Sequence, residues 1–305
     1  MTSATLTTSP REAGRPVELV SGLAELAPRY DLVLSDVWGV LHDGVTAFPA
    51  AGDALRRFRA GGGRVVLVSN APRPGFVVTR QLDGLGVPRD AYDDVVTSGD
   101  VTRALVSEHG TDRMFHLGPE RDIRLFDGLP ARSGSLEDAD FVVCTGLFDD
   151  ETETVEDYAD TLARMRARNL LMICANPDIV VERGHLLLPC AGALAVAYEA
   201  IGGTTVTGGK PHAPIYDAAL RAGATALGRA ADRARVLAVG DAIRTDVTGA
   251  RDYGLDALLV ARGIHAADMG YSTSSFSSEQ ALNWLTSQPR SPTALAPELS
   301  WAALP

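Results

Sequence analysis

Residues 32–41 read LVLSDVWGVL, and this stretch decides the fold. It opens with a near-continuous apolar run, Leu32–Ser35, which ends directly before the acidic residue Asp36. Short apolar runs of this kind are typical of strands that are buried on both faces of a parallel sheet. Ligands of such sheets bind beyond the carboxyl ends of the strands. Asp36 is therefore placed where a functional side chain is expected.

Similar apolar runs recur along the chain and alternate with longer amphipathic segments. We expect strands at Leu32–Ser35, Val65–Val68, Phe141–Cys144, Leu170–Cys174 and Val236–Val239. We expect helices at Ala50–Ala60, Thr154–Arg168, Pro214–Leu227 and Thr245–Tyr253. Strands that alternate with helices imply right-handed crossovers and parallel pairing. The expected architecture is α/β, with a doubly wound parallel sheet.

The composition predicts a folded protein that does not bind nucleic acid. The 305 residues carry a formal net charge of -11, whereas binding to a phosphate backbone needs a basic face. A small phosphorylated ligand remains compatible with this charge, because a metal ion and a few backbone N–H groups can hold it. The sequence leaves the oligomeric state open, a homodimer included.

The sequence also predicts a cytoplasmic protein without a membrane partner. Residues 1–16 are rich in Thr, Ser and Pro and lack the apolar region of a signal peptide, so residues 1–19 are expected to be disordered. The longest uncharged apolar stretch, Leu186–Tyr198, is too short to span a bilayer. The cysteines Cys144, Cys174 and Cys190 lack metal-ligand spacing and are expected to be buried, reduced thiols.

Polar residues follow two further strands in the same way as Asp36. Ser69 and Asn70 come after the second expected strand, and Asp241 comes after the last one. Lys210 lies in a Gly-Gly-Lys-Pro segment just before an expected helix. One such residue would be unremarkable, because Asp and Asn often end strands as turn residues. All of them in this order indicate one site at the carboxyl edge of the sheet.

These residue types suit phosphoryl transfer. The Asp36 carboxylate can act as a nucleophile that forms an aspartyl-phosphate and so divides the transfer into two steps. The negative charge on the transferring group needs positioned cations and donors. Lys210 would neutralise one side of that group, while Ser69 and the Asn70 N–H would donate hydrogen bonds to it.

A magnesium site is expected beside the nucleophile. Mg²⁺ typically takes one or two carboxylates together with water and phosphate oxygens. Asp36 and Asp241 would share the ion. Asp246 would support the ligands from the first turn of a helix that we expect Thr245 to cap.

Taken together, these segments resemble the four motifs of the haloacid dehalogenase superfamily of hydrolases. The matching segments are Asp36–Leu41, Ser69-Asn70, Gly209-Lys210-Pro211 and Gly240–Asp246. The finer pattern is similar to subfamily IIA, the NagD and p-nitrophenylphosphatase type. Its matching features are the loop Leu41–Pro49, the turn Asn176-Pro177-Asp178 and the Gly-rich stretch Gly192–Gly203.

The resemblance implies a Rossmann-like core in two pieces, residues 20–92 and 205–285, with a tail at 286–305. An α/β cap, residues 93–204, would be inserted between the second and third motifs and would choose the substrate. Asn176 and Asp178 would contact substrate at the mouth between cap and core. The backbone carbonyl of residue 38 would be a third magnesium ligand. Relatives act on small phosphorylated metabolites such as sugar phosphates, pyridoxal phosphate, phosphoglycolate and nucleotides.

The sequence departs from the family pattern at Trp38. Family phosphatases have a second Asp at this position, which protonates the leaving oxygen and then activates water. The indole of Trp cannot transfer a proton usefully, and the loss of a positioned acid/base costs roughly 10²–10⁴ in rate. The backbone carbonyl is retained, so the fold and the metal site are expected to survive the change.

Three interpretations follow from Trp38. The first is a phosphohydrolase whose substrate has a good leaving group, supplies its own proton, or relies on a surrogate such as His42 or Asp43. The second is a superfamily member that uses Asp36 on another bond, such as carbon–phosphorus or carbon–halogen. The third is a catalytically silent protein that binds a phosphorylated ligand and has a regulatory role.

Overall fold

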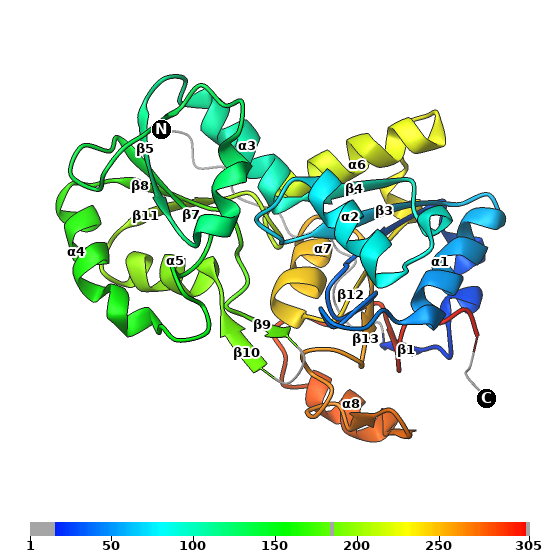
Figure 1. The fold of residues 1–305 in the computed structure, drawn as a ribbon. Helices are drawn as coiled ribbons and strands as arrows, with labels where there is room; N and C mark the ends of the chain where they lie inside the picture. Colours follow the sequence, from blue (N-terminus) through cyan, green and yellow to red (C-terminus); the bar gives the residue numbers. More distant parts are fainter. Residues whose placement is uncertain (1–15, 184–185, 303–305) are drawn as a thin grey trace, which may run out of the picture.

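The computed structural model describes residues 16–183 and 186–302, which form two lobes that each contain a parallel sheet (Figure 1). The larger lobe contains a seven-stranded core sheet in the order β1-β16-β13-β12-β2-β3-β4. Its strands are β1 Glu18–Leu19, β2 Leu32–Ser35, β3 Arg64–Ser69, β4 Asp94–Thr97, β12 Val236–Gly240, β13 Asp256–Val260 and β16 Ala294–Ala296. All six neighbouring pairs are parallel, which confirms the expected α/β fold class.

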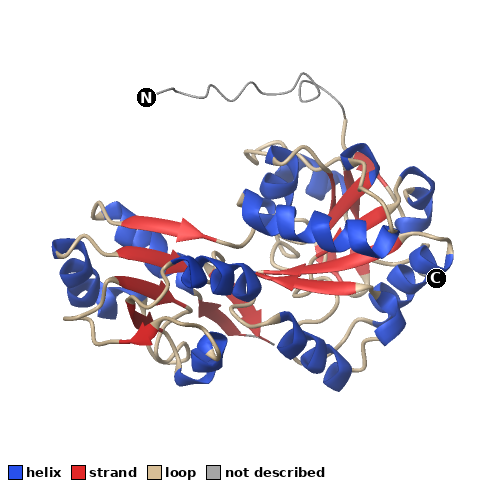
Figure 2. Cartoon of the chain, turned by 90° about the horizontal axis from the view of Figure 1, so that it is seen from above, coloured by secondary structure: helices blue, strands red, loops and turns tan. Residues whose placement is uncertain are grey.

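Helices cover both faces of the core sheet (Figure 2). On β2, Val33 packs into one apolar layer, whereas Leu32 and Leu34 pack into the layer on the opposite face. The near-continuous apolar run is therefore explained by burial on both sides. The α-helices of the described residues are α1 Pro49–Ala60, α2 Gly75–Leu85, α3 Ser98–Glu108, α4 Ala159–Ala167, α5 Ala191–Ala200, α6 Ala213–Leu227, α7 Thr248–Asp252 and α8 Ser278–Leu285.

The order of the core strands reverses between β2 and β12. From β2 the chain moves outward through β3 to β4, and from β12 it moves the other way through β13 to β16. Such a reversal is a topological switch point, where the carboxyl ends of two central strands open a crevice for a ligand. Asp36 and Asp241 follow these two strands directly. The fold therefore brings them to the same place from distant parts of the sequence.

The smaller lobe is the cap, and it has a five-stranded parallel sheet of its own in the order β11-β8-β7-β5-β6. Its strands are β5 Arg113–Leu117, β6 Arg132–Ser133, β7 Phe141–Cys144, β8 Leu171–Cys174 and β11 Thr204–Thr207. An antiparallel hairpin of β9 Val180–Arg183 and β10 Leu186–Pro189 lies between the two lobes (Figure 1). A second, very short hairpin pairs β14 Tyr271–Ser272 with β15 Ser275–Phe276.

Some expected boundaries differ from the structure. The strand β4 pairs with β3 in the core sheet, although the expected cap began at residue 93. The strand β11 pairs with β8 in the cap sheet, although the expected core resumed at residue 205. The segment 286–305 is not simply a tail, because β16 pairs with β13 inside the core sheet. The expected disorder of residues 1–19 falls largely outside the described residues, and within them β1 pairs with β16.

Two expected helices are also divided. The segment expected as one helix from residue 154 begins as a 3-10 turn, Val155–Tyr158, and continues as α4. The segment after Asp241 begins as a π-helical turn, Ile243–Val247, before α7. Thr245 lies inside that turn and Ala242 precedes it, so the expectation that Thr245 caps the helix was wrong.

Two further expectations concern cysteines and membrane segments. Cys144, Cys174 and Cys190 are buried free thiols, as expected. None of the helices within residues 16–183 and 186–302 combines the length and the apolar character that a bilayer crossing needs.

Candidate active site

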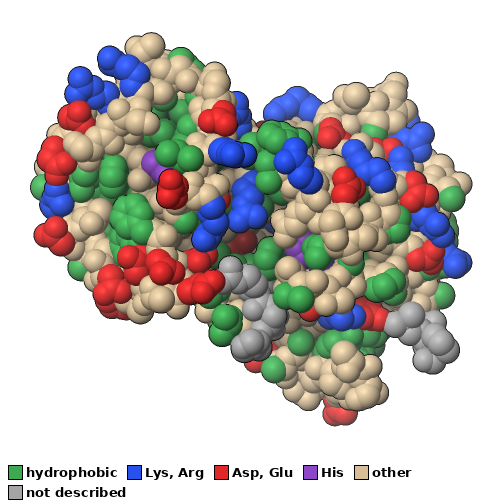
Figure 3. Space-filling view, viewed as in Figure 1, with side chains coloured by type: hydrophobic (Ala, Val, Ile, Leu, Met, Phe, Trp, Pro, Cys, Tyr) green, Lys and Arg blue, Asp and Glu red, His purple; other side chains and the backbone are tan. Residues whose placement is uncertain are grey.

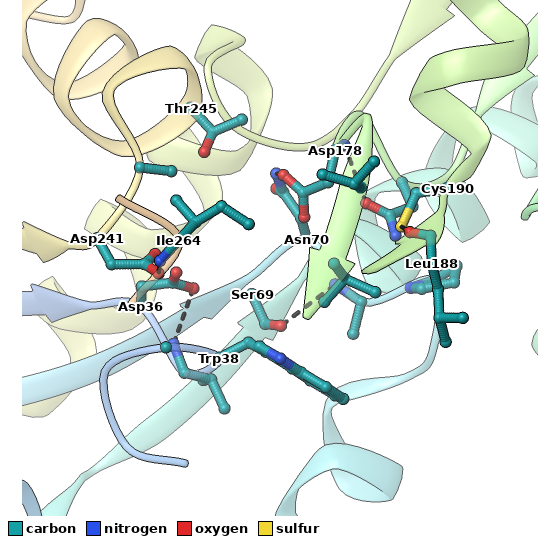
Figure 4. A pocket seen from close by; sticks show the side chains of 18 of the residues that line it. Asp36, Trp38, Ser69, Asn70, Asp178, Leu188, Cys190, Asp241, Thr245 and Ile264 are labelled. Carbon is teal, nitrogen blue, oxygen red and sulfur yellow. Dashed lines mark hydrogen bonds between the residues drawn. The ribbon is translucent and has the colours of Figure 1, made fainter. Parts of the chain in front are cut away.

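Three carboxylates meet at the switch point of the core sheet. Asp36, Asp241 and Asp246 each offer an oxygen atom such that these atoms lie within 4.8 Å of one another. Figure 4 shows Asp36 and Asp241 side by side at the ends of their strands. Because like charges at this distance repel one another, three buried carboxylates need cations to be stable in the ionised form.

The protein supplies one of those cations as Lys210. Its Nζ lies 2.6 Å from Asp36 Oδ1 and 2.7 Å from Asp246 Oδ1, and its side chain is almost fully buried. Burial lowers the pKa of the Lys210 ammonium, but Asp246 and Asp36 outweigh it and hold that pKa above its ordinary value. Lys210 is also the only lysine in the chain.

One ammonium does not balance three carboxylates. Burial, and next the charge of Asp246, raise the pKa of Asp36 to about 7, although Lys210 acts in the opposite direction. Burial, and next the charge of Asp36, raise the pKa of Asp241. The excess negative charge means that this cluster would gain stability from a divalent cation held by carboxylate oxygens.

Two glycines allow the carboxylate of Asp241 to lie so close to the backbone. Gly39 has φ +80°, and a Cβ there would lie 2.1 Å from Asp241 Oδ2. Gly263 has φ +126°, and a Cβ there would lie 2.2 Å from the same oxygen. The neighbouring Ile264 N–H donates to this oxygen at 2.9 Å. Only glycine leaves room for the Asp241 carboxylate at both positions. The two loops therefore need glycine at residues 39 and 263 for Asp241 to take its place in the site.

The Asn70 side chain joins three parts of the site. Its Oδ1 accepts from the Lys210 N–H at 2.7 Å, and its Nδ2 donates to Asp178 Oδ1 at 2.9 Å. Ser69 Oγ accepts from the Ala71 N–H at 3.2 Å, which leaves the hydroxyl proton of Ser69 to donate elsewhere. Asn70 thus positions the loop of Lys210 and anchors Asp178 from the cap side.

Asn176 and Asp178 lie on the cap segment that contacts the core. Asn176 Oδ1 accepts from the Asp178 N–H at 3.1 Å and so closes the Asn-Pro-Asp turn. Arg244 of the core donates to the Pro177 carbonyl at 2.7 Å. Asn176 and Asp178 both line the pocket, and the Asp178 carboxylate is engaged with Asn70.

Trp38 lines the pocket with its indole packed on its own loop. The indole contacts His42 edge-on, with ring centroids 5.0 Å apart, and it lies against the backbone of Gly44, where a Cβ would come within 2.5 Å of it. Figure 4 shows the indole directed away from the Asp36 carboxylate. The position that holds the acid/base in family phosphatases is thus occupied by a packing side chain.

The two proposed surrogates for the acid/base have other roles in this loop. His42 Nδ1 accepts from the Gly44 N–H at 2.9 Å, so the ring carries its proton on Nε2 and has no free lone pair. Burial lowers the pKa of His42 to about 4, so the ring is neutral near pH 7. Asp43 Oδ1 accepts from the N–H groups of Val45 and Thr46 at 2.9 and 2.7 Å. These bonds favour its ionised form, which cannot donate a proton.

A cavity of about 480 Å³ extends from this cluster to the cap. Its cap side carries polar residues that sequence reasoning missed, which are Arg121, Asp122, Thr145 and Asp150. Thr145 and Asp150 follow β7, an expected strand to which the strand-end argument was not extended. Arg121 and Asp122 follow β5, which was not recognised as a strand. That strand contains Arg113 and His116, and its charged and polar residues hide the apolar pattern.

Comparisons with known proteins identify the family of the chain. A model of the haloacid dehalogenase-like hydrolases matches residues 33–129, and a HAD-hydrolase-like model matches residues 207–299. The chain is 30% identical to D-glycerol 3-phosphate phosphatase of Mycobacterium tuberculosis over 80% of this chain and 67% of that protein.

Solved structures show the same relationship. A haloacid dehalogenase-like hydrolase from Brucella suis has a TM-score of 0.83 and 49% identity, over 92% of this chain and all of that chain. Glycerol phosphate phosphatase Rv1692 of M. tuberculosis, in complex with magnesium, has a TM-score of 0.65 and 26% identity, over 89% of this chain and 76% of that chain. NagD from Escherichia coli shares the fold, with a TM-score of 0.64 and 24% identity over 88% of this chain and 96% of that chain. The chain belongs to the haloacid dehalogenase-like hydrolases.

Proposed function

We propose that this protein is a magnesium-dependent phosphohydrolase that acts on a small phosphorylated metabolite through an aspartyl-phosphate at Asp36. The observation that supports this most strongly is the Asp36 carboxylate at the switch point, 2.6 Å from the Lys210 ammonium and beside Asp241. The M. tuberculosis relative named as a glycerol phosphate phosphatase supports the substrate class. We place the reaction in the cytoplasm, because the three cysteines are free thiols, as in reducing compartments.

The residues suggest a two-step reaction. The Asp36 carboxylate attacks phosphorus, the ester P–O bond breaks, and the leaving alkoxide takes a proton from water. Water then attacks the aspartyl-phosphate, which releases phosphate and restores Asp36. Lys210 would hold Asp36 in position and neutralise charge on the phosphoryl oxygens, with hydrogen bonds from Ser69 and the Asn70 N–H.

The carboxylate cluster fits a magnesium ion. Asp36, Asp241 and the Trp38 carbonyl would hold the ion, which would offset negative charge on the phosphoryl group. Asp246 would support the metal site without binding the ion itself, because its carboxylate is already paired with the Lys210 ammonium at 2.7 Å.

Addition of Mg²⁺ is expected to stabilise the protein. A ligand that binds only the folded state at a hundredfold excess over its Kd raises the free energy of unfolding by about 2.7 kcal/mol. Thermal unfolding with EDTA and with rising Mg²⁺ should show this as an increase in Tm. Asp241→Asn should remove the increase, whereas Asp252→Asn, an exposed control on α7, should keep it. An equal increase in both variants would contradict Asp241 as a ligand.

Trp38→Asp is expected to increase hydrolysis of an unactivated alkyl phosphate about tenfold or more. The change restores a carboxylate at the acid/base position, and tenfold corresponds to about 1.4 kcal/mol of transition-state stabilisation. It also removes the indole from His42 and Gly44, so Tm should be measured beside turnover. Trp38→Phe is the control, because it keeps an aromatic ring without an acid. A folded Trp38→Asp variant that binds Mg²⁺ and shows no gain would count against the phosphatase assignment.

The direct test of the proposed function is phosphate release from acetyl phosphate and 4-nitrophenyl phosphate. Acetyl phosphate is an acyl phosphate and 4-nitrophenyl phosphate is an aryl ester. Both have good leaving groups, so they need little protonation and should be hydrolysed despite Trp38. Release that depends on Mg²⁺ and on Asp36 supports the proposal. Absence of release from both compounds would favour a silent ligand-binding protein.

A further inference from the structure

The cap closes the far side of the pocket with the carboxyl ends of its own strands. Arg121 and Asp122 lie on the 3-10 helix Glu120–Phe126 that follows β5, and Thr145 follows β7 directly. All three line the same cavity as Asp36. Figure 3 shows basic side chains gathered at the notch between the two lobes. A phosphate ester bound at Asp36 would therefore direct its leaving group toward this polar part of the cap.

Asp122 is the unusual residue in this group. It is 4% exposed, and Thr145 and Arg73 both interact with its carboxylate, yet among the described residues its Oδ1 has no donor at hydrogen-bond distance. The nearest cation is Arg73 of the core, whose Nε lies 3.6 Å from Oδ1, beyond a good hydrogen-bond distance. Buried polar atoms in folded proteins are nearly always satisfied, and an orphan inside a ligand pocket is readily explained by a donor on the ligand.

The charges around Asp122 indicate the kind of donor. Arg73 faces Asp122, and Arg121 is paired with Asp150, so each arginine has a carboxylate partner. A second anionic group on the substrate would be repelled by the carboxylates of Asp122 and Asp150. A hydroxyl group suits the pair better, because it can donate to Asp122 and accept from Arg73 at the same time.

We propose that Asp122 and Arg73 form a leaving-group subsite that selects phosphate esters of neutral polyols by binding one of their hydroxyl groups. This inference rests on the proposed phosphohydrolase function and names its substrate class. Asp122 comes from the cap and Arg73 from the core, so the subsite is complete only when the two lobes face each other. The slow protonation expected from Trp38 affects turnover and does not affect binding, so binding is the sharper measure.

A purely structural role for the Arg73–Asp122 contact makes a different prediction. The Arg73 backbone is already held in place, because its carbonyl accepts from Thr97 Oγ1 at 2.6 Å. If the contact only latched cap to core, its loss would weaken the binding of all phosphate esters by the same factor. The ratio of two dissociation constants measured on one variant therefore separates the two roles.

The experiment is calorimetric titration in Mg²⁺ of the Asp36→Asn variant, which is expected not to turn the esters over. The probes are glycerol 3-phosphate, propyl phosphate, which lacks both hydroxyls, and phosphoglycolate, which adds a carboxylate. We expect glycerol 3-phosphate to bind about tenfold more tightly than propyl phosphate, as one hydrogen bond to a charged group allows. Phosphoglycolate should bind more weakly than glycerol 3-phosphate.

The selectivity should depend on both residues of the subsite. Adding Asp122→Ala to the Asp36→Asn variant should reduce the ratio of the dissociation constants of propyl phosphate and glycerol 3-phosphate from about tenfold to within about twofold. Arg73→Gln changes a part-exposed side chain and should do the same, so a folding defect in the first variant does not end the test. Arg124→Ala is the matched control, because Arg124 is exposed on the same 3-10 helix and does not line the cavity.

The outcomes separate this inference from the proposed function. Equal binding of glycerol 3-phosphate and propyl phosphate, binding of neither, tightest binding of phosphoglycolate, or a ratio unchanged by Asp122→Ala would overturn the subsite. Selective binding lost with Asp122→Ala would support it, even if the wild-type protein released no phosphate from acetyl phosphate. Release of phosphate without selectivity would leave the phosphohydrolase function standing and the subsite refuted.

Discussion

Asp36→Asn is expected to lower Mg²⁺-dependent release of phosphate from acetyl phosphate by about 10⁴-fold or more. An amide cannot attack phosphorus as a carboxylate does, and loss of the nucleophile in a covalent mechanism removes the whole route. The substitution keeps the size of the side chain, so the strand end and its neighbours should keep their packing. The measurement is steady-state phosphate release with protein of verified Tm.

The control for this experiment is Asp160→Asn, an exposed residue on α4 of the cap. It removes one carboxylate from the surface and should leave the rate within about twofold. Brief incubation of the wild-type protein with acetyl phosphate, followed by acid quench and peptide mass measurement, should place a phosphoryl group on the peptide that contains Asp36. Undiminished hydrolysis by Asp36→Asn would refute the aspartyl-phosphate mechanism.

The core of the fold could be predicted because its signals are local. The strand β2 and the cap strand β7 have the expected bounds, since both are apolar runs buried on both faces and followed by a change to polar or small residues. Asp36 and Asp241 could be placed together because parallel strands bring their carboxyl ends to one edge. The sequence was sufficient here, since each buried strand carries its own pattern.

Other parts of the fold have no such pattern. β16 is short and was hidden in a segment that reads as a tail, because Ala294–Ala296 needs β13 beside it to be a strand at all. From the sequence, Asn70 was expected to donate its N–H to substrate, and the role of its side chain was not foreseen. That side chain binds Lys210 and Asp178, which lie 140 and 108 residues away in the chain. Contacts of that range depend on the closed arrangement of cap and core, which local periodicity does not encode.

Lys210 has a significance that its motif alone does not convey. The chain uses arginine at every other basic position, and lysine only at this buried one. A compact ammonium can approach Asp36 and Asp246 at 2.6 and 2.7 Å at the same time, whereas a planar guanidinium needs room for five donors. The site thus requires a point charge of small volume, and an Arg would supply the charge without the shape.

Lys210→Met is expected to lower phosphate release about 10³-fold and to destabilise the Mg²⁺-free protein. Removal of a positioned cation or donor from a transition state costs about 10²–10³ in rate, and here the nucleophile also loses its orienting partner. Breaking a buried ion pair by removing one member typically costs about 3–5 kcal/mol, because the remaining charges stay unpaired. Urea unfolding in EDTA measures this loss, and added Mg²⁺ should recover part of it by neutralising the carboxylates.

Lys210→Arg distinguishes the charge of Lys210 from its shape. If both are needed, this variant should still lose at least about tenfold in rate, although its net charge is unchanged. Because Lys210 is the only lysine, reductive methylation followed by peptide mass measurement reports on this side chain without interference from other lysines. Burial predicts slow methylation in the folded protein and fast methylation in urea. Wild-type rates in Lys210→Arg, or equal methylation in both conditions, would mean that the buried ion pair with Asp36 does not govern the chemistry.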